Sequence, residues 1–142
     1  MNQERLIKII EDMQECVSDI DECLYLLTNR KDDLLIIKLA KSSLRQLFVS
    51  FHTILEDFCS ITLKDIKKYK IGISLHESLS ILKASNIIDD DMYLFLEKSR
   101  LIRNRISHRY KEPSHEELLL HILKYYDNFS NMINVTKQYL NK

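Results

Sequence analysis

The sequence predicts an all-α fold, an antiparallel helical bundle of four long helices with one short helix inserted, built as a single domain over residues 1–142. Three observations support this prediction. The chain has one glycine and one proline, too few for the turns of a β-sandwich or for a glycine-rich phosphate loop. Apolar residues recur every three or four positions, which is the spacing of one helix face. Two Ser-x-x-Glu segments match the capping box that begins a helix.

The first two helices are predicted from apolar stripes. An apolar stripe with an acidic outer face places the first helix at about residues 2–28. It consists of Leu6, Ile10, Met13, Val17, Ile20, Leu24 and Leu27. After a polar break, the second helix runs from residue 32 or 33 to about 63, and acidic residues at its start suit the helix dipole. Its stripe is Leu35, Leu39, Leu47, Phe51, Ile54, Phe58 and Ile61.

Three polar residues on the second helix allow two interpretations. His52, Glu56 and Asp57 belong either to its solvated face, which is the simpler interpretation, or to a set of partners for arginines further along the chain.

The second half of the chain is divided by a basic connector, residues 64–72, which ends at Gly72. The capping box Ser74-Leu-His-Glu77 begins a short helix that ends near residue 83 or 84. Asp89-Asp90-Asp91 opens a fourth helix, which Pro113 stops. Its buried stripe is Met92, Phe95, Leu96, Ser99, Ile102 and Ile106.

The final helix is predicted to begin at the second capping box, Ser114-His-Glu-Glu117, and to run unbroken to about Leu140. Its stripe is Leu118, Ile122, Tyr125, Phe129, Met132, Val135 and Tyr139.

Charge is unevenly distributed along a chain whose net charge is zero. Residues 1–33 carry four Lys or Arg and nine Asp or Glu. Residues 98–111 carry no acidic residue and six basic ones, namely Lys98, Arg100, Arg103, Arg105, Arg109 and Lys111. A neutral chain with one small basic site suggests local capture of a phosphate rather than wrapping of long nucleic acid.

The cysteine and histidine positions give no sign of a metal site. Cys16, Cys23 and Cys59 are odd in number and lack metal-ligand spacing, so free thiols in the reducing cytoplasm are the simple interpretation. We find no signal peptide and no membrane-spanning run. No carboxylate or histidine cluster has metal-ligand spacing, so we assign no metal and no cofactor. His76, His115 and His121 are expected on the surface or on a helix face.

The segment Arg103-Asn104-Arg105-Ile106-Ser107-His108-Arg109-Tyr110 carries the most chemistry and is expected in the last turns of the fourth helix. Histidine transfers protons at neutral pH, arginine matches phosphate oxygens, and a carboxamide can hold a ribose hydroxyl or orient an imidazole. On a regular helix Asn104 and His108 share a face, whereas Arg103 and His108 lie about 140° apart.

Arg103 and His108 therefore converge only over a broad groove, at an irregular helix end, or across a two-fold dimer. A different interpretation is structural, because histidine and basic residues at a helix C-terminus stabilise the helix dipole.

The pattern Arg103-Asn104-x-x-x-His108-x-Tyr110 resembles the Arg-x4-His signature of the HEPN superfamily, and with its trailing tyrosine it is similar to HepT-type toxins. The run-up Asn86-Ile-Ile-Asp-Asp-Asp and the helical size of one domain also fit. The resemblance implies a homodimeric, metal-independent endoribonuclease, the toxin of a type VII-like toxin–antitoxin pair. It implies that Arg103 and His108 are catalytic, with Asn104 supporting them.

The same resemblance implies a partner, a small nucleotidyltransferase antitoxin of the MntA kind. Such an antitoxin transfers AMP from ATP to the motif tyrosine, which is Tyr110 in this chain. The added phosphates would put negative charge and bulk where RNA phosphate must bind. Arg100, Arg105, Arg109 and Lys111 are then candidates for contacting the RNA phosphates.

Two alternatives remain open at the level of the sequence. The chain could be a non-catalytic helical partner, or substrate-binding subunit, of a minimal nucleotidyltransferase, since such proteins can retain the same motif. It could also be a helical dimerisation module whose basic patch binds nucleotide without turnover. Ser107, Arg105 and Arg109 fit all three functions.

Overall fold

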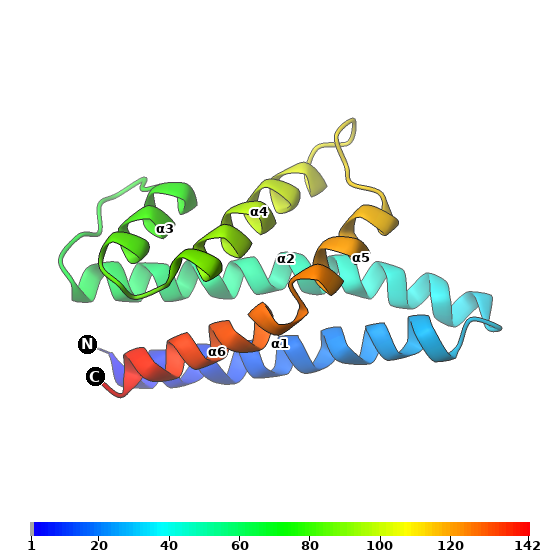
Figure 1. Ribbon diagram of the computed structural model, residues 1–142, viewed down its shortest axis with the longest axis horizontal. Coiled ribbons are helices and arrows are strands. Elements are labelled where there is room, and N and C mark those ends of the chain that lie inside the picture. Colours follow the sequence, from blue (N-terminus) through cyan, green and yellow to red (C-terminus); the bar gives the residue numbers. More distant parts are fainter. Residues whose placement is uncertain (1) are drawn as a thin grey trace.

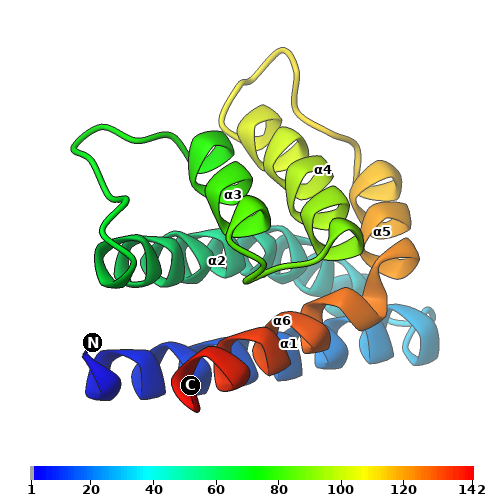
Figure 2. The same cartoon turned by 60° about the vertical axis from the view of Figure 1, so that its left-hand side comes forward.

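The computed structural model describes residues 2–142 and contains six helices and no strand within them (Figure 1). The helices are α1 (Gln3–Asn29), α2 (Leu34–Asp65), α3 (Leu75–Ala84), α4 (Asp90–Ile106), α5 (His115–Lys124) and α6 (Tyr126–Leu140). This confirms the all-α prediction. The long helices α1 and α2 form an antiparallel pair, and α6 packs along α1. Helices α3 and α4 pack together against the other side of α2 (Figure 2).

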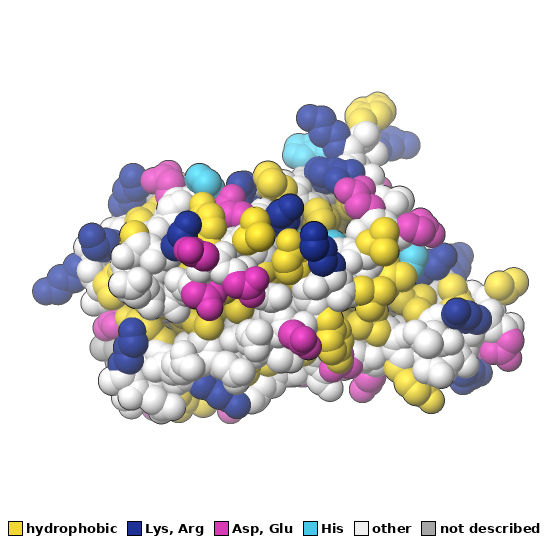
Figure 3. Space-filling model, viewed as in Figure 1, with side chains coloured by type: hydrophobic (Ala, Val, Ile, Leu, Met, Phe, Trp, Pro, Cys, Tyr) yellow, Lys and Arg dark blue, Asp and Glu magenta, His cyan; other side chains and the backbone are white. Residues whose placement is uncertain are grey.

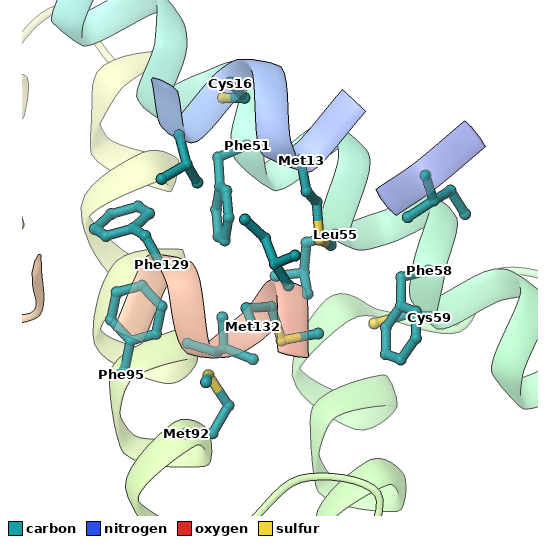
Figure 4. Packing of buried hydrophobic residues seen from close by; sticks show 14 of the residues in the cluster. Met13, Cys16, Phe51, Leu55, Phe58, Cys59, Met92, Phe95, Phe129 and Met132 are labelled. Carbon is teal, nitrogen blue, oxygen red and sulfur yellow. The ribbon is translucent and has the colours of Figure 1, made fainter. Parts of the chain in front are cut away.

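The core is filled by aromatic side chains from α2, α4 and α6. Phe51, Phe95 and Phe129 meet at its centre, where the Phe129 ring centroid lies 4.9 Å from those of both other rings (Figure 4). Such edge-to-face contacts add to the stabilisation from burial. From α1, Met13 and Cys16 reach the same cluster. The core therefore joins both layers of the bundle, and α4 is fixed to it through Phe95.

Side-chain caps begin four of the helices where the sequence places them. Asp33 accepts hydrogen bonds from the backbone N–H groups of the first turn of α2. Ser74 and Ser114 accept from the N–H groups of Glu77 and Glu117, at 3.0 Å and 3.1 Å. Asp89 accepts from the N–H of Met92 at 2.8 Å and begins α4. The short polar caps satisfy N–H groups that have no partner inside the helix.

The prediction of one unbroken final helix is wrong, because the helix is interrupted at Tyr125. This residue ends α5 and precedes α6, with φ −108° and ψ 26°. The interruption lets α5 pack beside the end of α4 while α6 turns to run along α1 (Figures 1 and 2). Tyr125 remains buried and its ring lies 5.4 Å from that of Phe95. The change of direction is therefore held by the core.

The predicted stripe of the second helix is wrong at its start, where Leu35 and Leu39 are 64% and 58% exposed. The turn between α1 and α2 extends past the other helices, so no other helix within residues 2–142 covers that part of the surface (Figure 1). Here the buried face of α2 is formed by Ala40 and Leu44.

The cysteines are free thiols, as predicted, and all three are buried. Burial raises the pKa of Cys16 and of Cys59 to about 12, and it also raises the pKa of Cys23. Over residues 2–142, no helix is long and apolar enough to cross a membrane.

Candidate functional site

The motif is divided between a helix and a loop, because α4 ends at Ile106 and not near Pro113 as predicted. Arg103 and Asn104 lie on the last turn of α4, and His108 and Tyr110 lie beyond it. The N–H of His108 donates to the carbonyl oxygen of Arg105, three residues earlier, at 3.1 Å. This i→i−3 bond closes a 3₁₀-type turn, which is tighter than the i→i−4 turn of an α-helix. Asn104 and His108 therefore do not stack on one helix face, and the loop sets the position of His108.

Two arginines anchor the far end of this loop. The Nε of Arg105 donates to the carbonyl oxygen of Lys111 at 2.9 Å, and its guanidinium pairs with Glu117 on α5. From α2, Arg45 pairs with Glu112 and donates to the carbonyl oxygen of Pro113. Arg105, predicted to bind phosphate, thus holds the loop to the bundle.

The tip of the loop is open to solvent. His108, Arg109 and Lys111 are exposed, and Tyr110 is 97% exposed. Figure 3 shows Lys and Arg side chains gathered with a histidine on this projection above α4. The salt bridges within residues 2–142 do not involve Arg109 or Lys111. These two cations are therefore available to an anionic ligand.

Arg103 is held by a carboxylate of α2, at 3.0 Å from the Oε1 of Glu56. Of the two interpretations of the polar residues on α2, pairing with a motif arginine is thus correct for Glu56. Asp57 is exposed and belongs to the solvated face. The pair with Glu56 fixes the orientation of the Arg103 guanidinium and offsets part of the positive charge of that group.

A cleft of about 370 Å³ lies beside Arg103, and we call it the α2–α4 cleft. Its lining from α2 is Glu56, Cys59, Ser60 and Leu63; from the connector, Tyr69, Ile73 and Ser74; from α3, Leu75, His76 and Ser78; and from α4, Arg100, Arg103 and Asn104. The cleft brings together three of the predicted site residues. His108, Arg105, Arg109, Tyr110 and Lys111 are not part of its lining.

One wall of the cleft contains a network that the sequence did not reveal. Glu97 accepts two hydrogen bonds from the Arg100 guanidinium, at 2.9 Å and 3.3 Å, and one from Nδ1 of His76 at 2.9 Å. Burial opposes ionisation of Glu97, but its bonds to Arg100 and His76 prevail and lower its pKa. Arg100 is thereby committed to a carboxylate. Glu97 and Arg100 are three residues apart on α4, a spacing visible in the sequence, whereas His76 comes from α3 and no sequence spacing could indicate its contact with Glu97.

Beneath the motif lie two buried histidines, which corrects the expectation of a solvated His52 and a surface His121. His52 is fully buried, with Nδ1 2.8 Å from the carbonyl oxygen of Phe48 and Nε2 without a partner in residues 2–142. His121 is 8% exposed, and its Nε2 lies 2.7 Å from Oγ of Ser99. Burial lowers the pKa of each histidine to about 4, with Arg103 adding to the effect on His52 and Lys124 to that on His121.

These two imidazoles are therefore neutral at physiological pH and form part of the core. His76 and His115 do lie on the surface or partly exposed, as expected. Among residues 2–142, no group of three or more His, Cys, Asp and Glu side chains is arranged to hold a metal ion.

The arrangement supplies an exposed imidazole, two available cations, and a fixed guanidinium beside a polar cleft. An imidazole can act as a general acid or a general base. A guanidinium can hold a phosphate oxygen. Together these groups are suited to reactions at a phosphate ester.

Comparison with known proteins adds evidence on the fold. No family model matches the chain, and no curated protein sequence does. The chain is similar to one in a solved structure, the crystal structure of a toxin-antitoxin with AMP-PNP. The two chains share 19% identity with a TM-score of 0.74, over 96% of this chain and 99% of the other. At this level of identity the likeness shows a common fold over nearly the whole chain.

Proposed function

We propose that the chain is the toxin of a toxin–antitoxin pair and acts as a metal-independent endoribonuclease of the HEPN type. The observation that carries the proposal is the loop after α4, which presents His108 and Tyr110 to solvent just after the helix turn that holds the salt-bridged Arg103. The likeness in fold to a chain of a toxin-antitoxin crystal structure supports it.

In the proposed reaction an imidazole removes the proton from a ribose 2′-OH, and the oxygen attacks the adjacent phosphorus. The bond to the 5′-oxygen breaks, that oxygen takes a proton from a second imidazole, and a 2′,3′-cyclic phosphate remains. Arg103 stabilises the charge on the phosphoryl oxygens, and Asn104 orients the ribose hydroxyl or the imidazole. Two copies of the chain in a homodimer supply the two His108 side chains to one composite site.

A direct test incubates the purified protein and a His108→Ala variant with total cellular RNA in EDTA. We expect the wild type alone to cleave, leaving 2′,3′-cyclic phosphate ends. His115→Ala is the matched control, because His115 lies outside the motif at the start of α5, and it should cleave like the wild type. Cleavage by His108→Ala at the wild-type rate would remove His108 from the mechanism.

Regulation is proposed to act on Tyr110. Its near-complete exposure lets a nucleotidyltransferase antitoxin reach the phenol and transfer AMP to it. The oxygen of Tyr110 would attack the α-phosphorus of ATP, with loss of its proton and release of pyrophosphate. The new phosphate would lie beside Arg109 and compete with RNA for the cations of the loop.

We expect Tyr110→Phe to remain toxic in cells and to escape silencing by the antitoxin. The matched control is Tyr25→Phe, since Tyr25 is also an exposed tyrosine, at 63%, but lies on α1. Growth with and without the antitoxin gives the answer, and mass spectrometry locates any added AMP. If the antitoxin fully silences Tyr110→Phe without modifying it, the antitoxin acts by binding and covering the toxin and not by AMP transfer.

One observation favours a second function. Three arginines of the basic segment, Arg100, Arg103 and Arg105, are each paired with a carboxylate. Such pairing weakens attraction for RNA and suits a chain that acts as the non-catalytic partner of a minimal nucleotidyltransferase. Under this function the wild type would not cleave RNA in the experiment above.

A further inference from the structure

The α2–α4 cleft has a charge balance that indicates its ligand. Both arginines in its lining are already bonded to carboxylates, Arg103 to Glu56 and Arg100 to Glu97. A phosphate enclosed in the cleft would lie next to the Glu56 carboxylate, which repels it. An uncharged ligand with hydrogen-bonding edges meets no such penalty, and serine hydroxyls and the Asn104 carboxamide offer it donors and acceptors.

The size of the cleft and the charged residues that adjoin its lining in the sequence indicate a ligand that is one unit of an anionic polymer. Its volume of about 370 Å³ is at the lower end of the range for small-molecule sites, roughly 300–1,000 Å³. Tyr69 contributes an aromatic ring to the lining. Exposed lysines of the connector, Lys67 and Lys68, directly precede Tyr69. On the α4 side the cleft reaches Asn104, from which the chain continues to the loop with Arg109 and Lys111.

We propose that the α2–α4 cleft binds one nucleoside of single-stranded RNA, with its base among the polar groups of the lining and its phosphates held by the lysines of the connector and by the cations of the loop after α4. An unstacked base can use its hydrogen-bonding edge and its face at once, which a paired base cannot. Glu56 can accept from an exocyclic amine, and Asn104 can bond a base edge or the ribose. The inference rests on the proposed function for the identity of the polymer, and it adds the subsite that selects unpaired RNA.

The test uses binding, so that it does not depend on cleavage. The probes are a fluorescein-labelled 2′-O-methyl trinucleotide, which lacks the attacking hydroxyl, and the same labelled backbone without bases. Ser60→Phe fills the cleft from α2, and Ser43→Phe makes the same substitution on α2 at a different groove. Circular dichroism and thermal melting establish that both variants are folded.

By fluorescence anisotropy, we expect the wild type and Ser43→Phe to bind the probe with bases about tenfold more tightly than the baseless one, as the loss of base contacts implies. In Ser60→Phe the two probes should bind with nearly equal affinity. Tyr69→Ala, which removes an exposed ring without filling space, should also reduce the ratio of the affinity for the probe with bases to that for the baseless probe. A ratio that is unchanged in Ser60→Phe and Tyr69→Ala would overturn the nucleoside site.

The two proposals can fail separately. Base-dependent binding that Ser60→Phe abolishes, in a wild type that does not cleave RNA, leaves the nucleoside site intact and rejects the nuclease. Cleavage by the wild type together with equal binding of both probes rejects the nucleoside site and leaves the nuclease intact.

Discussion

His52 shows at the scale of one residue how an imidazole can reduce stability and still be accommodated. Its Nδ1 reaches the Phe48 carbonyl oxygen, while its Nε2 is buried without a partner. An unpartnered buried polar atom costs about 1–3 kcal/mol of folding free energy. By contrast, the buried Nε2 of His121 is satisfied by Ser99. Of the two buried histidines, one thus has an unsatisfied ring nitrogen and the other a satisfied one.

We expect stability to fall as the pH is lowered from 7 to 4. The pKa of His52 is about 4 in the folded chain and about 6.5 when unfolded, so between these values the unfolded state binds more protons. The contribution is fully present above pH 6.5 and is lost as the pH falls through 4. The shift corresponds to about 3 kcal/mol from His52 alone, and His121 acts in the same direction.

Urea unfolding at pH 7 and pH 4.5 measures this loss. His52→Leu removes both the titrating group and the orphaned Nε2, so we expect it to be at least as stable as the wild type at pH 7 and to lose less in acid. A His52→Leu variant with the wild-type pH dependence would show that other groups govern the acid sensitivity.

At the scale of elements, the loop of residues 107–114 combines an anchored end with an open tip. Arg105 ties its backbone to α5, and Arg45 ties it to α2. His108 and Tyr110 gain access to solvent from the open tip, and the anchors limit how far they can move. Arg105 thus fixes the position of the loop.

We expect Arg105→Ala to speed hydrogen exchange of the backbone amides in residues 107–113 without changing that of the α2 core. The reason is the loss of the bond to the Lys111 carbonyl oxygen and of the pair with Glu117. Arg109→Ala is the control, because it removes a cation from the same loop without removing an anchor. Equal exchange in all three proteins, measured by mass spectrometry, would show that the loop is held by other contacts.

Most helix positions follow from the sequence, but two helix ends do not. Periodicity and polar caps are local properties, which is why α1 and the starts of α2, α3, α4 and α5 agree with prediction. The break at Tyr125 adds no glycine or proline and leaves the apolar spacing intact, so no local signal marks it. The end of α4 at Ile106 likewise lacks a glycine, and Pro113 was the visible stop signal.

The candidate site was predictable in its residues and not in its contacts. The basic segment with His108 stands out by composition alone. The pairing of Arg103 with Glu56 and the bond between His76 and Glu97 each join two different helices. Such contacts are decided by packing of the whole bundle, which spacing along one helix cannot reveal.

At the scale of the whole molecule, the proposed chemistry requires more than one chain. One copy offers a single His108 in the loop after α4, and the reaction needs one imidazole to accept a proton and another to donate one. We expect the purified protein to sediment as a dimer at micromolar concentration. A strict monomer that still cleaves RNA would show that one chain holds the complete site.

The buried cysteines give the folded molecule a surface without reactive sulfur. Only a thiolate attacks an electrophile, and raised pKa values keep Cys16 and Cys59 protonated in the native state. The cysteines of the native chain can therefore be alkylated only when the bundle opens, and the rate of alkylation measures how often it opens. A cysteine introduced at the loop tip would react long before the native three, so a probe could be attached there alone.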